Sequence, residues 1–311
     1  MTKRILITGA AGYIGLQLGN RLADDHEVLG LDIRSNERAR YPLRKFDVRD
    51  PSLEQLLTER QITHVVHLAS VLQASGDPQR DYDIDVNGTE NVLRACVSAG
   101  VDHLCVTSSG AAYGYHADNP DWIDESTPLR GNREFAYAWH KRLIEERLAH
   151  YRQAHPQLQQ LIFRPGTVLG AETRNQITGL FLAPAVLRLC GADSPFVFIW
   201  DQDVVAAMEK GIREGQSGIF NMAGDGALPM KTIARKLGKP SVTLPVSVVR
   251  SGLRIAGWLG KPVGPEQVDF LRYRPVLSNE RLKHEFGFIP EKTSEQVLDF
   301  FIEQARIAGD L

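Results

Sequence analysis

The sequence contains little cysteine, and this scarcity excludes two kinds of stabilising structure. Its 311 residues include three cysteines, Cys96, Cys105 and Cys190, with no C-x-x-C spacing among them. A disulfide framework needs several paired cysteines, and a cysteine-bound zinc site needs closely spaced ligands. The nine histidines show no H-x-x-x-H spacing, so we expect no metal ion. Unpaired cysteines are typical of a reducing compartment, and we expect a cytoplasmic location.

The sequence also lacks a strong charge of either sign and a long apolar run. A formal net charge of -2 provides no basic field for sequence-independent binding of nucleic acid. No run has the length of a transmembrane helix, and residues 1–4 lead directly into the strand-like segment 5–7 instead of a signal-peptide core. We therefore expect a small-molecule substrate, with neither a nucleic-acid nor a membrane partner.

What the sequence does contain is an alternation of short apolar runs and helical patterns. The runs at 5–7, 28–31, 65–68, 104–106 and 161–163 are apolar throughout, as in strands buried on both faces. Apolar residues at helical spacing lie between them, and a long helix is expected over 135–154. The pattern predicts an α/β fold with a Rossmann-type, doubly wound parallel sheet. The rhythm changes after Pro165, so residues 166–311 are expected to form a smaller substrate-binding region with returns into the first sheet.

A glycine-rich turn follows the first expected strand and opens the first expected helix. The segment reads Gly9-Ala10-Ala11-Gly12-Tyr13-Ile14-Gly15. Glycines at this spacing permit a tight turn and let backbone N–H groups approach a pyrophosphate at the positive end of the helix. The strand–turn–helix context supports a dinucleotide-binding loop. Residues 1–165 are therefore expected to form an NAD-binding domain.

Asp32 stands at the end of the second expected strand, about twenty residues beyond the glycines. A carboxylate there accepts hydrogen bonds from the adenosine ribose hydroxyls and repels a 2′-phosphate, which favours NAD. The alternative role for Asp32 is to cap a turn. Arg34 leaves NADP open, because a guanidinium pairs with a 2′-phosphate.

Tyr137 and Lys141 lie one helical turn apart, so their side chains share a face of the expected long helix. A tyrosine with a pKa of about 10 is a poor base at neutral pH, and a nearby ammonium favours the phenolate. Ser108 and Ser109 stand where the preceding strand ends, at the sheet edge where open α/β sheets bind ligands. Either hydroxyl can stabilise a substrate oxygen, or simply bond its own loop backbone.

Together these features resemble the extended short-chain dehydrogenase/reductases, the NAD-dependent epimerase/dehydratase family. The similar segments cover most of the chain: Thr8–Gly15, Asp47-Val48, His67–Ala69, Asn87–Thr89, Ser108–Gly114, Tyr137–Lys141, Arg164-Pro165, Phe198–Val204 and the closing Leu282–Pro290. The match is specific in the first half and looser after Gly170. Such proteins usually form homodimers through the helices that correspond here to residues 80–99 and 135–152.

The resemblance also implies roles for individual residues. Asp47 and Val48 would flank the adenine. Ala69 and Asn87 would line the nicotinamide half of the cofactor, with Leu68 as a further cofactor contact. The catalytic hydroxyl would belong to Ser109, four residues before Tyr113-Gly114. Tyr137 would be the general acid/base, and Lys141 would bind the nicotinamide ribose.

Two positions depart from the sugar-nucleotide members of the family. Thr167 stands where they commonly carry an asparagine, and Ser194-Pro195 stand where they often place an arginine. Residues 164–168 are at least as similar to the 3β-hydroxysteroid dehydrogenase and dihydroflavonol reductase branch. The leading hypothesis is a nucleotide-sugar epimerase or dehydratase. The alternatives are a simple NAD(P)-dependent dehydrogenase or reductase of a hydrophobic alcohol or ketone, and a non-catalytic dinucleotide sensor.

Two segments outside these motifs carry expectations of their own. The long loop over 114–134 is expected to form part of the substrate wall, or else a solvated excursion. The apolar stretch 246–259 is expected to form the core of the smaller region, with a lid over a greasy substrate as the alternative.

Overall fold

A computed structural model describes residues 2–72, 74–192, 195–259, 264–265 and 267–311 of the chain. Its centre is a seven-stranded parallel sheet with the order β10-β6-β5-β4-β1-β2-β3. The strands are β1 (Arg4–Thr8), β2 (Glu27–Asp32), β3 (Leu43–Lys45), β4 (His64–His67), β5 (His103–Thr107), β6 (Gln159–Pro165) and β10 (Gly218–Met222). The order reverses direction at β1, as in a doubly wound sheet, and this confirms the expected fold class.

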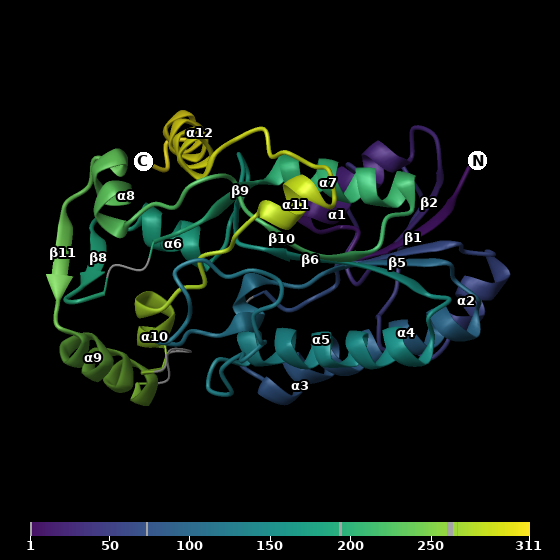
Figure 1. Ribbon diagram of the computed structural model, residues 1–311, viewed down its shortest axis with the longest axis horizontal. Helices are drawn as coiled ribbons and strands as arrows, with labels where there is room; N and C mark the ends of the chain where they lie inside the picture. The colour runs from purple at the N-terminus through teal and green to yellow at the C-terminus, as the bar shows by residue number, and fades with distance from the viewer. Residues whose placement is uncertain (1, 73, 193–194, 260–263, 266) are drawn as a thin grey trace.

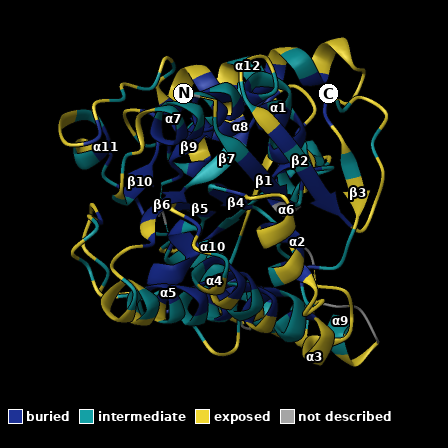
Figure 2. Ribbon diagram, turned by 90° about the vertical axis from the view of Figure 1, so that its right-hand side faces the viewer, coloured by how far each residue is buried: buried dark blue, intermediate teal, exposed yellow. Residues whose placement is uncertain are grey.

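Helices cover both faces of this sheet because its strands are apolar on both faces (Figures 1 and 2). Ile5 and Ile7 pack toward one layer, and Leu6 between them packs toward the other. The first layer contains α1 (Tyr13–Leu22), α7 (Asp201–Glu214) and α11 (Glu280–His284). The second contains α2 (Leu53–Glu59), α4 (Gly88–Ser98) and α5 (Ala136–Ala154), with α3 (Pro78–Tyr82) beside them.

The second half of the chain builds a smaller body at one end of the sheet (Figure 1). It contains two two-stranded parallel sheets, β7 (Thr167–Leu169) with β9 (Phe198–Trp200), and β8 (Val186–Leu189) with β11 (Ser241–Leu244). Its helices are α6 (Gln176–Leu182), α8 (Met230–Leu237), α9 (Val246–Trp258), α10 (Gln267–Arg272) and α12 (Ser294–Ile307). Strand β10 of this half joins the central sheet beside β6, so the two halves share one sheet.

The expectation that 246–259 forms the core of this body is wrong. The segment is helix α9, but Val249 is the one residue of that helix that is buried. The core lies instead among α6, α8, α12 and the strands β8 and β9, around Phe181, Phe196 and Phe301. Local apolarity predicted a covered segment, but the outer face of α9 has no covering element within the part of the chain that the structure describes.

Candidate active site

The glycine turn lies at the carboxyl end of β1, in close contact with the end of β4. Gly9 has a φ of +70°, and a Cβ added to it would lie 2.7 Å from the backbone nitrogen of Ala69. A Cβ on Gly15 would collide with the carbonyl oxygen of Gly9. Only glycine fits at both positions, since the backbones approach too closely for a side chain. The turn is thereby held against Leu68 and Ala69, which the resemblance also assigns to the cofactor site.

The N-terminus of α1 has the features of an anion-binding helix end. Gly12 is the N-cap, and with no side chain it leaves the first amides of the helix uncapped. The first turn also contains no acidic residue, so no side-chain charge offsets the positive end of the helix dipole. Tyr13 turns away from this end, and its hydroxyl donates a 2.7 Å hydrogen bond to Asp201 of α7. Burial and this bond raise the pKa of Tyr13 to about 12.

Asp32 lies beside the same turn. Its carboxylate is almost fully buried and accepts hydrogen bonds of 3.0 Å from the backbone N–H groups of Ala11 and Arg34. The Arg34 side chain is exposed and its Nε lies 3.6 Å from the Asp32 carboxylate. The aspartate thus joins the glycine turn to the end of β2, at the position where a ribose hydroxyl is recognised in this fold.

Asp47, Val48 and Asn87 form a second group further along the same sheet edge. Arg49 donates to both carboxylate oxygens of Asp47, and these bonds lower the pKa of that carboxyl. Arg49 also pairs with Asp83 at 2.8 Å, and Asp83 accepts a bond from Asn87. Asn87 is therefore linked to the group expected around the adenine.

Tyr137 and Lys141 lie on α5 beside the end of β5. The Lys141 ammonium is buried, lies 5.7 Å from the centre of the Tyr137 ring, and donates a 3.2 Å hydrogen bond to the carbonyl of Thr107. Ser109 lies two residues after the end of β5 and caps η2 (Gly110–Tyr113) by accepting a bond from the Ala111 amide. The Ser108 hydroxyl is buried and has no hydrogen-bond partner among the described residues. The fold thus brings the tyrosine, the lysine and both serines to one sheet edge.

A buried polar group that the sequence did not indicate lies beneath α5. Asp85, in the π-helix η1 (Asp83–Asn87), accepts hydrogen bonds from His140, Ser70 and the Val71 amide. Burial opposes ionisation of Asp85, but the bond from His140 and the charge of Lys141 outweigh it and lower its pKa. His140 therefore packs inside this chain. The bond between Asp85 and His140 joins η1 to α5 at the residue before Lys141. Asp85 and His140 are too far apart in the sequence to form a recognisable motif.

A second buried group connects α5 to β6 and β10. Arg164 donates to both carboxylate oxygens of Glu145 at 2.7 and 2.6 Å, and to the hydroxyl of Tyr113 at 2.8 Å. Tyr113 in turn donates to Asn221. Glu125, from the loop over 114–134, accepts a bond from the Asn221 amide, and burial raises the pKa of Glu125. This network fixes the long loop to the sheet close to η2.

Aromatic side chains extend the site beyond Tyr137, two of them from the first half of the chain and Phe270 from α10 of the smaller body. Tyr115, Phe135 and Phe270 contact one another, with ring centres 5.2 to 5.8 Å apart, and Tyr137 packs against this cluster. The buried guanidinium of Arg274 lies over the rings of Phe196 and Phe270, and burial lowers its pKa to about 9. Sequence patterns did not single out Arg274. Thr167 begins β7, and Ser194 lies outside the described residues.

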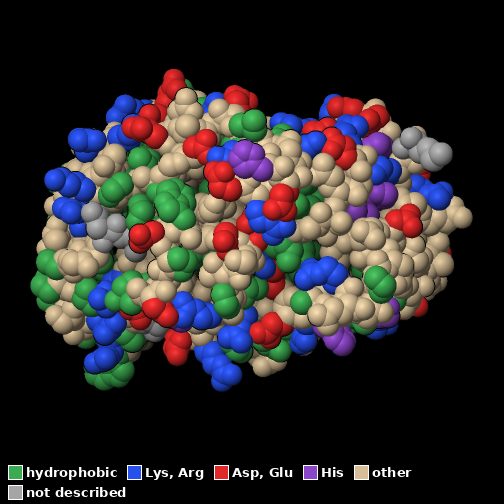
Figure 3. Space-filling view, in the orientation of Figure 1, with side chains coloured by type: hydrophobic (Ala, Val, Ile, Leu, Met, Phe, Trp, Pro, Cys, Tyr) green, Lys and Arg blue, Asp and Glu red, His purple; other side chains and the backbone are tan. Residues whose placement is uncertain are grey.

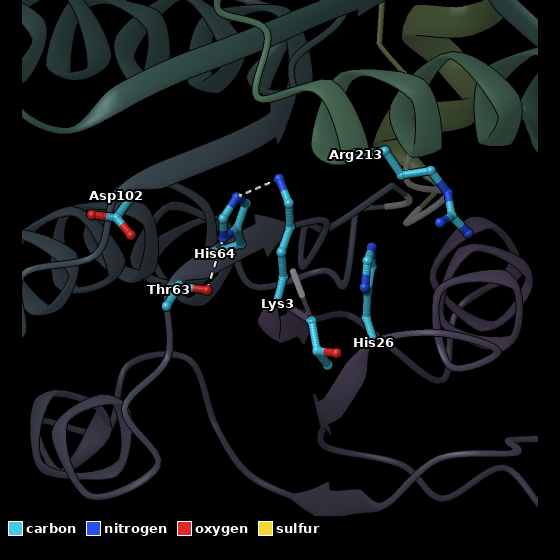
Figure 4. A pocket seen from close by; sticks show the side chains of 7 residues that line it. Lys3, His26, Thr63, His64, Asp102 and Arg213 are labelled. Carbon is cyan, nitrogen blue, oxygen red and sulfur yellow. Dashed lines mark hydrogen bonds between the residues drawn. The ribbon is translucent and has the colours of Figure 1, made fainter.

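A hollow of about 460 Å³ lies at the opposite edge of the sheet, near the amino ends of the strands (Figure 4). Lys3, His26, His64 and Arg213 line it, and Lys3 bonds to His64 at 3.0 Å. Parallel sheets of this type bind ligands at their carboxyl edge, so this hollow is separate from the glycine turn and Tyr137.

Comparison with known proteins agrees with this geometry. Residues 5–223 match the NAD dependent epimerase/dehydratase family. The chain belongs to this family. It is therefore an NAD-dependent enzyme of the extended short-chain dehydrogenase/reductase type.

Individual relatives cover nearly the whole chain. An N-acetyl-alpha-D-glucosaminyl-diphospho-ditrans,octacis-undecaprenol 4-epimerase of Escherichia coli O157:H7 is 26% identical, over 96% of this chain and 94% of its own length. An uncharacterized protein of Mycobacterium tuberculosis is 25% identical, over 96% of this chain and 82% of its own. The crystal structure of the UDP-glucose 4-epimerase of Thermotoga maritima with UDP-glucose has a TM-score of 0.76 at 20% identity, and covers 98% of this chain and 99% of the other.

Proposed function

We propose that this enzyme epimerises a hexose carried on a diphosphate, with Tyr137 as the general acid/base. The observation that carries the proposal is the placement of Tyr137 on α5, one turn before the buried ammonium of Lys141. A tyrosine at this position, one turn from a buried ammonium, can exchange a proton with a sugar hydroxyl.

The glycine turn and Asp32 fit NAD. The uncapped N–H groups of α1 and the absence of acid from its first turn suit a pyrophosphate, and the Asp32 carboxylate suits an unphosphorylated ribose. The second group, with Asp47, Val48 and Asn87, would then lie along the adenosine half. When bound, NAD supplies the site that takes a hydride from the sugar and returns it.

The residues of this chain then perform the proton chemistry. Tyr137 removes the proton of the sugar hydroxyl at its Oη and later returns it. The hydroxyl of Ser109 donates a hydrogen bond to the sugar oxygen as it becomes a carbonyl, which stabilises the charge that develops there. Lys141 would bond the nicotinamide ribose and place its positive charge beside the Tyr137 ring.

The substrate would lie between Tyr137 and the smaller body that residues 166–311 form. The Arg274 guanidinium stacks on Phe196 in a buried setting, and a diphosphate would stabilise its charge there. Two relatives point to the same chemistry, since one acts on a diphospho-undecaprenol sugar and the other was crystallised with UDP-glucose. We also propose a homodimer formed through α4 and α5.

The aromatic cluster of Tyr115, Phe135 and Phe270 supports a second candidate, a simple dehydrogenase of a hydrophobic alcohol. Such an enzyme must exchange its cofactor in every cycle. A retained NAD favours the epimerase, and an NAD that dissociates freely favours the dehydrogenase.

The test measures the rate at which the wild type and the variant Tyr137→Phe interconvert UDP-glucose and UDP-galactose, and the lipid-diphosphate analogues of these sugars. We expect kcat to fall at least about a hundredfold, because proton transfer is lost. Tyr151→Phe, on the same helix, removes a hydroxyl that bonds Glu90 and serves as the matched control. Equal activity of Tyr137→Phe and Tyr151→Phe would refute the role of Tyr137.

A further inference from the structure

Helix α9 presents an apolar stripe to solvent, interrupted at its middle turn by Ser251 and Gly252. Val248, Ile255 and Leu259 are spaced at i, i+7 and i+11, which places them within about 40° of one another around the helix. All three are exposed, and Trp258 beside them is 88% exposed. The opposite face of α9, around Val249 and Leu253, packs on Leu189 and Val268. The inner face is therefore already used for folding, and the outer stripe is available for a partner.

The segment that carries this stripe contains basic and no acidic side chains, and the acids nearest to it belong to other elements: Arg250 pairs with Asp269 of α10, and Lys236 pairs with Glu295 and Asp299 of α12. The segment 226–259 contains six lysines and arginines and no aspartate or glutamate, in a protein whose formal net charge is -2. Lys231, Arg235 and Arg254 of this segment are exposed. Arg254 lies next to the stripe on α9. Figure 3 shows green and blue side chains together at the end of the molecule where β11 and α9 lie.

We propose that α9 docks this enzyme on an anionic membrane surface. Apolar residues with an exposed tryptophan, flanked by arginine and free of acid, are the composition of helices that lie in the interface of a bilayer. Trp258 suits the headgroup level, because its ring is apolar and its N–H remains hydrated. The basic residues complement the negative potential of anionic lipids. None of the described helices is long and apolar enough to cross a membrane, so the contact is peripheral.

The location of α9 relates this docking to the candidate active site. Helix α9 packs on α10, and α10 contributes Phe270 to the aromatic cluster around Tyr137. A membrane bound to the outer face of α9 would therefore lie on the substrate side of the molecule. No membrane partner was expected from the sequence, because composition alone does not show which face of α9 the fold leaves uncovered.

The docking is tested by flotation of the full-length protein with phosphatidylcholine vesicles that contain, or lack, phosphatidylglycerol. We expect binding to the anionic vesicles, weakened by salt, and little binding to phosphatidylcholine alone. The double variant Ile255→Ser, Trp258→Ser should lose at least about tenfold in vesicle partitioning, because it removes the apolar contact. Arg254→Glu should weaken binding only to the anionic vesicles. Ile307→Ser on α12, also exposed at 74%, is the control and should bind as the wild type.

Thermal melts check that each variant is folded. Sedimentation of the protein without vesicles tests the alternative that the stripe binds a second copy of the chain. The proposal is overturned if the wild type does not float with anionic vesicles, or if the double variant floats equally well. It is also overturned if the wild type self-associates through the stripe, the double variant is monomeric and neither binds lipid. Epimerase activity is not needed for any of these readouts, so the docking and the proposed reaction can fail independently.

Discussion

Replacing Asp85 by asparagine should destabilise the protein strongly without changing its shape. The carboxylate is 1% exposed and accepts three hydrogen bonds: from the Ser70 hydroxyl at 3.0 Å, from the Val71 amide at 2.8 Å and from His140 Nδ1 at 2.9 Å. The donors lie on both sides of the carboxylate, with Ser70 and Val71 at Oδ1 and His140 at Oδ2. An asparagine has one acceptor oxygen, so with that oxygen at Ser70 and Val71 its NH2 group faces His140 Nδ1, which accepts a hydrogen bond only in the tautomer protonated at Nε2.

The expected loss follows from those contacts. A hydrogen bond to a charged acceptor contributes about 1.5–3 kcal/mol, and a buried donor left without a partner costs about 1–3 kcal/mol more. Asp85→Asn either leaves one donor without its partner or forces His140 into its other tautomer, and in both cases the bonds lose their charge assistance. We therefore expect the free energy of unfolding to fall by about 3 kcal/mol.

The assay is urea unfolding of Asp85→Asn beside Asp83→Asn, its neighbour in the same π-helix. Asp83 pairs with Arg49 near the surface, and its side chain is 39% exposed, so its loss should cost less than about 1 kcal/mol. Asp85→Asn should also lower kcat, since α5 carries Tyr137 and Lys141. Equal destabilisation by the two variants would show that the buried group does not position α5.

Three other perturbations have expected outcomes of their own. Gly15→Ala should weaken NAD binding by about tenfold or more in a fluorescence titration, because its Cβ meets the Gly9 turn, whereas Gly179→Ala, with open space around it, should bind normally. Glu145→Gln should cost about 3–5 kcal/mol in chemical unfolding, because the buried Arg164 charge loses its partner; a loss below 1 kcal/mol would count against that network. Burial lowers the pKa of His67 to about 3, so the unfolded chain binds the extra proton between pH 3 and about 6.5, and the contribution of His67 to stability should fall by about 1.4 kcal/mol per pH unit as pH drops through that window. Unfolding measured at pH 7 and 5.5 should show a stability difference that is smaller in His67→Asn than in the wild type; identical differences would refute the assignment.

The central sheet was predictable because its strands are marked in the sequence itself. Residues 5–7, 28–31 and 104–106 are apolar throughout, and the observed β1, β2 and β5 extend these runs by one residue at each end. The position of Tyr137 followed in the same way, since the helical pattern over 135–154 places it beside the end of β5. These features depend on residues that are close together in the sequence, so the spacing of apolar residues was enough to predict them.

The parts that could not be predicted depend on residues far apart in the chain. Asp85 and His140 are 55 residues apart, so neither shows its partner in the sequence. Arg274 acquires its surroundings from Phe196, which lies on another element. The apolar stretch 246–259 looked like core because composition alone does not show which face of a helix will be covered.

The central claim is that a hydride leaves the sugar and returns to the same molecule while Tyr137 moves the proton. The most direct test is incubation of the purified enzyme with UDP-glucose deuterated at C4, followed by mass spectrometry of the product and absorbance of any NADH released. We predict UDP-galactose that retains the deuterium, with no net NADH. A keto product with one NADH released per turnover would contradict the account and identify a simple dehydrogenase.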